Sequence, residues 1–193
     1  MRDVEDGEAL APQGKGYVNV PPSASIDSIT SEVTVAAWVY IDGTIADYAT
    51  AISRQIGTGY NQHYHLSVNA QQAAFLFITT PAAGQVAIAS PTTVPQQTWV
   101  HIAGTYDGSQ SRLYVNGAEV ASHATTGPFA AETNPVILSG NGNPPGNTVS
   151  ELFPGRLDEV MLYRRALAPD EIARLQAGAL LPSTGFHLDA GPQ

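Results

Sequence analysis

The sequence predicts an all-β fold, a two-sheet antiparallel β-sandwich with one short helix in the C-terminal region. In the first strand of the segment 98–122, the side chains from Trp99 to Tyr106 divide between two faces with a period of two, as they do in extended strands. Asp107-Gly108 and Asn116-Gly117 divide this segment into three strands, because these residues accept the positive φ of tight turns. With 18 glycines and 14 prolines in 193 residues, we expect one domain with many turns between short strands.

The longest apolar strand is expected at 33–41, where both faces carry apolar side chains and therefore indicate a central position in a sheet. A strand at 17–20 is stopped by Pro21 and Pro22, and 23–32 is expected to be a polar connection. The other strands are expected at 49–54, 64–69, 73–79, 86–89, 98–106, 112–115, 118–122, 136–139 and 157–163. This pattern alone does not choose between immunoglobulin-like, jelly-roll and barrel forms.

One helix is expected at 168–177. Pro169 suits its first turn, where a missing N–H costs nothing, and Asp170 favours the positive end of the helix dipole. Gly178 is typical of a C-terminal cap. Only a narrow apolar stripe is present, so we expect the helix to lie on the surface of the sheets.

The composition excludes several classes of partner. A net charge of −9, with only eight Lys and Arg, disfavours nucleic acid and anionic membranes. The acid excess is a weak indication of divalent cations, although solubility alone explains it. The absence of cysteine removes disulfides and thiol catalysis, and no run of about 18 apolar residues is present to insert into a membrane.

The two ends of the sequence favour a module cut from a longer multidomain chain. No apolar signal segment follows Met1, and 183–193 has the small and polar residues of a linker. A cytosolic protein is the alternative. We expect residues 1–180 to form the domain and 181–193 to be a tail, a linker or a final added strand.

Six segments together carry a family resemblance: VTVAAWVYIDG (33–43), AISRQ (51–55), YHLSV (64–68), TWVHIAGTYDG (98–108), RLYVNGAEV (112–120) and FPGRLDEVMLYRRALAPDEIARL (153–175). As a set, in this order, they resemble the laminin G-like, or concanavalin A-like, jelly-roll domains. The resemblance implies two curved antiparallel sheets of roughly six or seven strands each. It also implies an extracellular or cell-surface module that binds glycan or protein, often with a bound calcium ion.

Relatives usually open with a strand that is not evident here, because little chain precedes Gly7. The segment 185–189, GFHLD, looks like that opening strand displaced to the C-terminus. We expect it to fill the same sheet position or to begin a following repeat, with a disordered tail as the alternative.

Asp158 is the sharpest candidate for a metal ligand. By strict alternation it shares a face with Val160 and Leu162, and a carboxylate on an apolar face needs a cation or several donors. Calcium takes such hard oxygen ligands. The alternative is an Asp held by backbone N–H groups or by Arg156.

The resemblance extends this candidate to a structural calcium site. In related laminarinase-type jelly rolls, the matching Asp binds calcium together with backbone oxygens of the N-terminal region. Carried over, Asp158 supplies a carboxylate, Gly14 supplies a carbonyl, and Asp6 or Asp189 completes the ligand shell.

Candidate ligand-binding residues lie in the loop and strand that contain Tyr60, Asn61, His63 and His65. The two histidines are expected to share one strand face, and two ligands are too few for a transition metal. Stacking and hydrogen bonding to a sugar is one use of this set, and a polar rim is the other.

Two further positions are candidates for ligand contact. Arg54 ends a strand where relatives often carry a basic residue, and it is either a carboxylate partner in a cleft or a ligand contact. Asn141 and Asn143 lie in a long Gly- and Pro-rich loop that is a candidate recognition element.

Taken together, these observations favour a non-catalytic recognition module of a secreted or surface protein, binding carbohydrate or protein. An architectural spacer domain of the same fold is the alternative. A glycoside hydrolase needs paired carboxylates about 5–10 Å apart. The related hydrolase families place them as E-x-D-x-x-E on one strand, and no strand here carries that motif.

Overall fold

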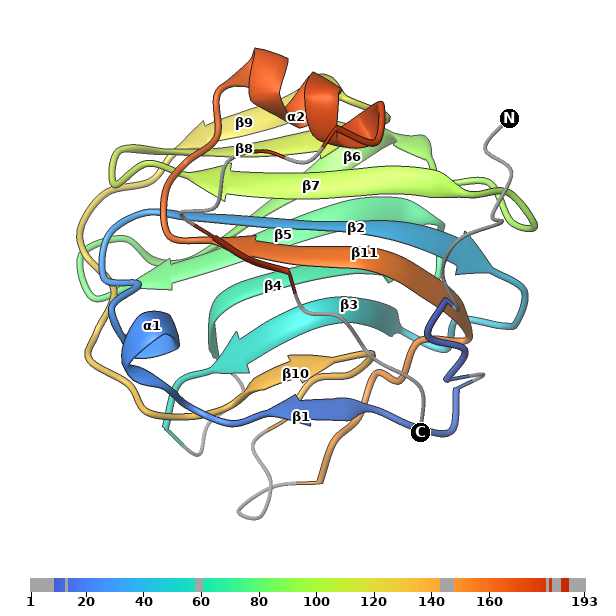
Figure 1. Ribbon diagram of the computed structural model, residues 1–193, viewed down its shortest axis with the longest axis horizontal. Helices are drawn as coiled ribbons and strands as arrows, with labels where there is room; N and C mark the ends of the chain where they lie inside the picture. The colour runs from blue at the N-terminus through green and yellow to red at the C-terminus, as the bar shows by residue number, and fades with distance from the viewer. Residues whose placement is uncertain are drawn as a thin grey trace.

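The computed structural model describes residues 9–12, 14–57, 61–142, 148–179, 181 and 185–187, which form two antiparallel sheets packed as a sandwich (Figure 1). One sheet, here the β4 sheet, has the order β1 (Val18–Val20), β10 (Val136–Leu138), β3 (Tyr48–Gln55), β4 (Gln62–Asn69), β5 (Ala73–Thr80) and β6 (Gly84–Thr93). The other, here the β2 sheet, has the order β12 (Gly185–His187), β11 (Gly155–Tyr163), β2 (Val33–Ile41), β7 (Val100–Tyr106), β8 (Gln110–Val115) and β9 (Ala118–Ala124). The predicted two-sheet antiparallel jelly roll is therefore confirmed.

The core lies between the two sheets and follows from the period of two along each strand. On β2, alternate residues from Val33 to Ile41 point into the core, and from β4 the side chains of Tyr64, Leu66 and Val68 meet them. The intervening residues of β2 are also mostly buried, as expected for a central strand. Burial of each such large apolar side chain stabilises the fold by roughly 1.5–3 kcal/mol.

The central meander forms the turns that its residues predict. Asn116 and Gly117 have φ values of 48° and 80°, so both central positions of the hairpin adopt the left-handed region. In the preceding turn, Asp107 Oδ1 accepts hydrogen bonds from the backbone N–H groups of Ser109 and Gln110 at 2.9 and 2.8 Å.

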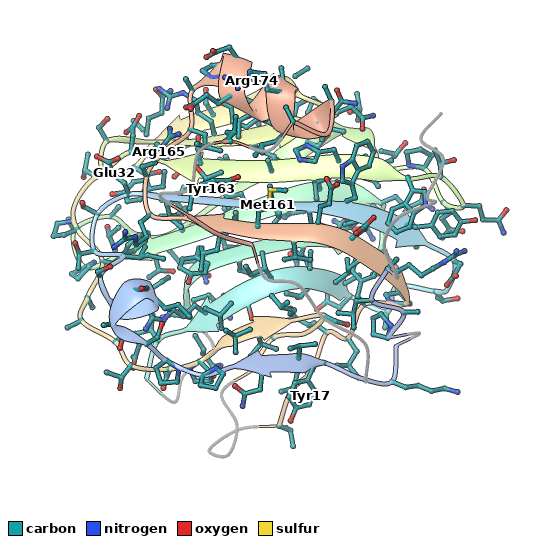
Figure 2. All side chains as sticks on the ribbon, viewed as in Figure 1. Tyr17, Glu32, Met161, Tyr163, Arg165 and Arg174 are labelled. Carbon is teal, nitrogen blue, oxygen red and sulfur yellow. The ribbon has the colours of Figure 1, made fainter. Side chains whose placement is uncertain are left out.

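The predicted helix is present as α2 (Pro169–Gln176) and packs on the outer face of the β2 sheet. Ile172 and Leu175 bury their side chains in a second apolar cluster that includes Met161 and Tyr163 of β11. Figure 2 shows these two labelled residues on β11. The N-cap Ala168 has no side-chain acceptor, but its backbone N–H donates to Glu171 Oε2 at 3.0 Å.

Two elements differ from the expectation. The one-turn helix α1 (Ala24–Asp27) lies inside the predicted polar connection, where Ile26 N–H donates to the Ser23 side chain at 3.3 Å. A single turn has no apolar period to reveal it. Strand β6 (Gly84–Thr93) is longer than the strand expected at 86–89 and continues through Pro91, because β6 is an edge strand where proline is tolerated.

Part of the C-terminal tail joins the β2 sheet. Residues 185–187 form β12, which pairs antiparallel with β11 and occupies the edge of the sheet. The rest of 182–193 lies outside the described residues. Among the described helices, neither is long and apolar enough to span a membrane.

Candidate functional site

A β-bulge changes the face on which Asp158 lies. The register of β11 against β2 shifts between Asp158 and Met161, so one extra residue is accommodated on β11. Leu157 and Val160, three positions apart, consequently both point into the core, and Glu159 has a φ of 45°. The prediction that Asp158 shares the face of Val160 and Leu162 is therefore wrong.

Asp158 lies instead on the outer face of the β2 sheet. It pairs with Trp38, which points away from the core because its neighbours on β2 point into it. Asp158 is half-buried, and its Oδ1 accepts a hydrogen bond from Glu159 N–H at 2.8 Å. Among the described residues, no group of three His, Cys, Asp or Glu side chains is placed to hold a metal.

The proposed calcium ligands fall in different parts of the chain. Asp6 and Asp189 lie outside the described residues. The backbone N–H of Gly14, which has a φ of 68°, donates to the Phe153 carbonyl at 2.9 Å. Calcium at Asp158 therefore stays a prediction.

A second bulge separates the two candidate histidines of β4. The register of β4 against β3 shifts between the pairs Arg54–Tyr64 and Gln55–Gln62, so His63 is the extra residue. Its ring lies 5.2 Å from the ring of Phe129, a member of the core. His65 points to the opposite, outer face of the β4 sheet, so the expectation of a shared face is wrong.

Arg54 is a carboxylate partner in the interior, the first of the two roles considered for it. Its side chain is 1% exposed, and Nη2 donates to Asp27 Oδ1 at 2.5 Å. The other donors reach backbone carbonyls of Ile26, Glu132 and Asn134 at 2.8–3.1 Å. Arg54 therefore fastens β3 to α1 and to the segment before β10, and its guanidinium is directed away from solvent.

The structure brings His65 and Asn141 together around Glu151. Thr50 Oγ1 lies 2.7 Å from His65 Nε2 and donates to Glu151 Oε2 at 2.9 Å. Asn141 Nδ2 donates to the same oxygen at 3.2 Å, and its Oδ1 accepts from Gln62 Nε2 at 3.3 Å. We call these five residues the His65 cluster.

Local backbone geometry positions Glu151 at the end of the long loop. Asn141 and Ser150 exchange backbone hydrogen bonds of 2.9 and 2.8 Å, which close the loop and place Glu151 beside Asn141. The Glu151 carbonyl accepts from Thr50 N–H at 3.0 Å. Glu151 has a φ of 52°, a costly conformation for a non-glycine residue that is commonest at functional sites.

Protonation states in the His65 cluster follow from burial and from the count of protons. Burial lowers the pKa of His65 to about 3, so the imidazole is neutral at pH 7 and the 3.4 Å contact with Glu151 is not an ion pair. The Thr50 hydroxyl gives its one proton to Glu151, so His65 Nε2–H is the donor to Thr50. Burial raises the pKa of Glu151 against the opposing hydrogen bonds from Thr50 and Asn141.

Beside the His65 cluster lies a group of half-buried aromatic rings, Tyr48, Phe75 and Phe77, which we call the aromatic shelf. Phe77 stacks on His65 with ring centroids 5.0 Å apart, and Phe75 stacks on Phe77 at 5.7 Å. Tyr48 meets both phenylalanines edge-on at 5.6 Å. The charge of Glu151 contributes, after burial and Asp47, to raising the pKa of Tyr48, so shelf and cluster are electrostatic neighbours.

Sequence reasoning missed both Glu151 and the aromatic shelf. The shelf had a readable signal, since Phe75 and Phe77 alternate with the core residues Ala74, Leu76 and Ile78 along β5. Glu151 had none beyond an acid at a loop end.

The remaining candidates are partly outside the described residues. Tyr60 and Asn143 lie there. Asn61 is exposed, and its carbonyl accepts from Ile56 N–H at 2.8 Å.

The chain is similar to several characterised proteins. It is 36% identical over 78 residues to pappalysin-1 of Mus musculus, a match that covers 38% of this chain and 4% of pappalysin-1. Domain 4 of AbnA, a GH43 extracellular arabinanase from Geobacillus stearothermophilus solved with arabinotriose, is similar with a TM-score of 0.66 and 21% identity, covering 91% of this chain and 79% of that chain.

The CBM40 of the Ruminococcus gnavus IT-sialidase, solved bound to α2,3-sialyllactose, is similar with a TM-score of 0.62 and 15% identity, over 84% of this chain and 96% of that chain. At these identities the two structural likenesses show the fold alone. The sequence match that decides the family covers residues 12–173. The chain belongs to the concanavalin A-like lectin/glucanases superfamily.

Proposed function

We propose that this domain is a non-catalytic carbohydrate-recognition module whose ligand lies on the outer face of the β4 sheet. The observation that carries the proposal is the aromatic shelf of Tyr48, Phe75 and Phe77 beside the polar side chains of Asn141 and Glu151. A sugar ring has an apolar C–H face and a rim of hydroxyls, so it needs both kinds of surface side by side.

The proposal assigns different tasks to the two surfaces. The half-buried rings of the aromatic shelf offer apolar area to the sugar face, with little side-chain entropy to lose. The oxygens of Glu151 accept hydrogen bonds from sugar hydroxyls, and a charged acceptor forms the stronger kind of hydrogen bond. His65 holds Phe77 and Thr50 in place from beneath.

A binding role, rather than hydrolysis, is supported by the setting of Glu151. Its Oε2 is occupied by hydrogen bonds from Thr50 and Asn141 at 2.9 and 3.2 Å. The E-x-D-x-x-E arrangement of related hydrolases is absent from the sequence. The similar CBM40 domain was solved with a bound oligosaccharide, and its name is that of a carbohydrate-binding module.

The wider setting is proposed as a secreted or surface protein with further domains. The similar arabinanase domain is part of an extracellular enzyme, and the matched part of pappalysin-1 is 4% of that protein.

A structural calcium near Asp158 is also proposed. Leu157 N–H donates to the Leu10 carbonyl at 2.8 Å, so the N-terminal backbone runs beside the residue that precedes Asp158.

A glycan array with and without calcium tests the recognition role, followed by calorimetric titration of the best glycan. We expect Phe77→Ala and Tyr48→Ala to weaken binding about tenfold or more, since each removes a contact surface of the kind that dominates binding free energy. The matched control is Trp99→Ala, which removes a half-buried aromatic ring that packs on Tyr40 at 5.5 Å on the opposite sheet.

The melting temperature of each variant separates lost binding from lost folding. Absence of binding to any glycan would favour a spacer or a protein partner. Loss of binding in Trp99→Ala but not in the shelf variants would place the ligand on the other sheet.

A further inference from the structure

The cationic side chains of the chain are distributed unevenly over the two sheets. Arg112 and Arg156 belong to β8 and β11 of the β2 sheet, and Arg164, Arg165 and Arg174 follow β11 or lie on α2. Figure 2 shows Arg174 on α2 and Arg165 beside the same sheet. Of the other three, Arg54 points into the interior, Lys15 precedes the edge strand β1, and Arg2 lies outside the described residues.

Strands β3, β4, β5 and β6 contain a single Arg, Arg54, and no Lys. Because Arg54 points into the interior, these four strands place no cationic side chain on the outer face of the β4 sheet. The sequence contains no Lys or Arg at 58–60 or at 143–147 either, which lie outside the described residues. The charges that act at this face are acidic. Burial and then the charges of Asp47 and Glu151 raise the pKa of Tyr48, and Asp47 also acts to raise the pKa of Glu151.

One carboxylate oxygen of Glu151 has no hydrogen-bond donor among the described residues. Thr50 and Asn141 both donate to Glu151 Oε2, and Oε1 receives no hydrogen bond from the described residues. The Glu151 side chain is 24% exposed. It is held in place by its neighbours, so it presents Oε1 as a preorganised acceptor beside the aromatic shelf.

We infer that this face selects neutral glycans over glycans that carry a carboxylate or a sulfate, and that Glu151 is the residue that determines this selectivity. The inference rests on the proposed function. A hydroxyl of a neutral sugar donates a hydrogen bond to Glu151, whereas an anionic group near the same carboxylate meets like-charge repulsion without a cation to offset it.

The fold alone does not decide between neutral and acidic glycans, so the side chains on the binding face must decide. The similar arabinanase domain was solved with arabinotriose, a neutral oligosaccharide, and the similar CBM40 was solved with α2,3-sialyllactose, an acidic one. An acidic ligand needs guanidinium or ammonium donors for its carboxylate. In this chain Arg54 is the one arginine of the β4 sheet, and its N–H groups already donate to Asp27 and to three backbone carbonyls.

Matched pairs of probes test the inference: lactose against α2,3-sialyllactose, and galactotriose against trigalacturonic acid, each titrated by calorimetry at low salt. We expect the neutral member of a pair to bind about tenfold or more tightly than the acidic member. Raising the salt concentration should narrow the gap, because screening weakens the repulsion.

Glu151→Gln should weaken the neutral probe and strengthen the acidic one, so that the ratio approaches one. Asp47→Asn, at an exposed position, should bring the ratio of the two affinities, neutral probe to acidic probe, closer to one without disturbing the hydrogen bonds of the His65 cluster. The control Glu119→Gln removes the same charge from β9 on the other sheet and should leave the ratio unchanged.

The outcomes separate the two claims. If an acidic probe binds as tightly as its neutral partner, and Phe77→Ala weakens both, the selectivity is wrong and the proposed function stands. If no probe and no glycan of the array binds, the proposed function fails and the selectivity fails with it.

Discussion

The imidazole of His65 stacks on the ring of Phe77, its cross-strand partner on β5, with centroids 5.0 Å apart and planes inclined by 18°. His65 is 3% exposed and Phe77 is half-buried, so the histidine supports the aromatic shelf from the protein side. The same imidazole is hydrogen-bonded to the Thr50 hydroxyl, which donates a hydrogen bond to Glu151. His65 is therefore a positioning residue that joins the apolar and polar parts of the proposed site.

Acid should destabilise the fold through two of its buried histidines, His63 and His65. Burial lowers the pKa of His63 to about 4, together with the charge of Arg54, and burial lowers that of His65 to about 3. Below pH 6.5 the two histidines bind protons in the unfolded chain but stay neutral in the folded protein. Their contribution to the free energy of unfolding is therefore complete above this pH and is lost as the pH falls toward 4. We expect the free energy of unfolding to fall by about 1.4 kcal/mol per pH unit for each histidine.

Urea unfolding between pH 7.5 and 4.5 measures this slope. Glu151 acts in the opposite direction, because its raised pKa lets the folded state bind a proton first. His65→Gln should remove one histidine's share of the slope. The matched control is His123→Gln, at an exposed position on β9. Equal slopes in all three proteins would contradict the assignment.

Replacement of Arg54 should be among the most damaging single changes. Arg54→Met leaves the Asp27 carboxylate and three backbone carbonyls without their donors, and loss of one member of a buried pair costs about 3–5 kcal/mol. Arg156→Met is the matched control, since Arg156 is half-exposed and lies over the Tyr40 ring at 4.2 Å. Its cost should stay below about 1 kcal/mol. Denaturant midpoints decide, and similar losses in both variants would refute the structural role of Arg54.

A methyl group at Gly155 should disrupt the start of β11. A Cβ built at Gly155 would collide with the Tyr40 carbonyl oxygen on β2, and backbone atoms cannot rotate away as a side chain can. We expect Gly155→Ala to lower the free energy of unfolding by about 2 kcal/mol or more. Gly16→Ala, with no atom within 4 Å of the added Cβ, should be nearly neutral. A Gly155→Ala protein as stable as the parent would show that β11 and β2 are not paired this closely.

Calcium should raise the melting temperature if Asp158 ligates it. Ligand binding stabilises the folded state in proportion to the logarithm of ligand concentration, so the shift should grow with added calcium and vanish with a chelator. Asp158→Asn should abolish the response, while Glu119→Gln on β9 should keep it. An identical response in the two variants would rule Asp158 out as a ligand.

Much of the architecture could be predicted from local patterns. The Asn116-Gly117 hairpin, the doubly apolar β2 and the helix that begins at Pro169 all appear as expected. The residues that predict each of these elements lie within a few positions of one another inside that element, so contacts with other segments do not alter the prediction.

The candidate site was predicted less well, because faces depend on register. His65 and Asn141 were identified and do meet, through Glu151. His63 was grouped with His65 by counting in twos, and the bulge beside it turns it toward Phe129 instead. An extra residue in one strand of a pair cannot be detected without the partner strand.

The sequence by itself determined most of the strands, the turns of the central meander, the helix that begins at Pro169 and the small number of Lys and Arg, since these depend on backbone preferences and on charge counts. Only the tertiary structure decided which side of each sheet a residue occupies. A bulge in β11 against β2 places Asp158 on the outer face. Arg54 forms an ion pair with Asp27, which lies 27 residues away in the chain. Glu151 reached Thr50 across 101 residues. Such contacts depend on how distant segments pack, and packing between segments leaves no periodic trace in the segments themselves.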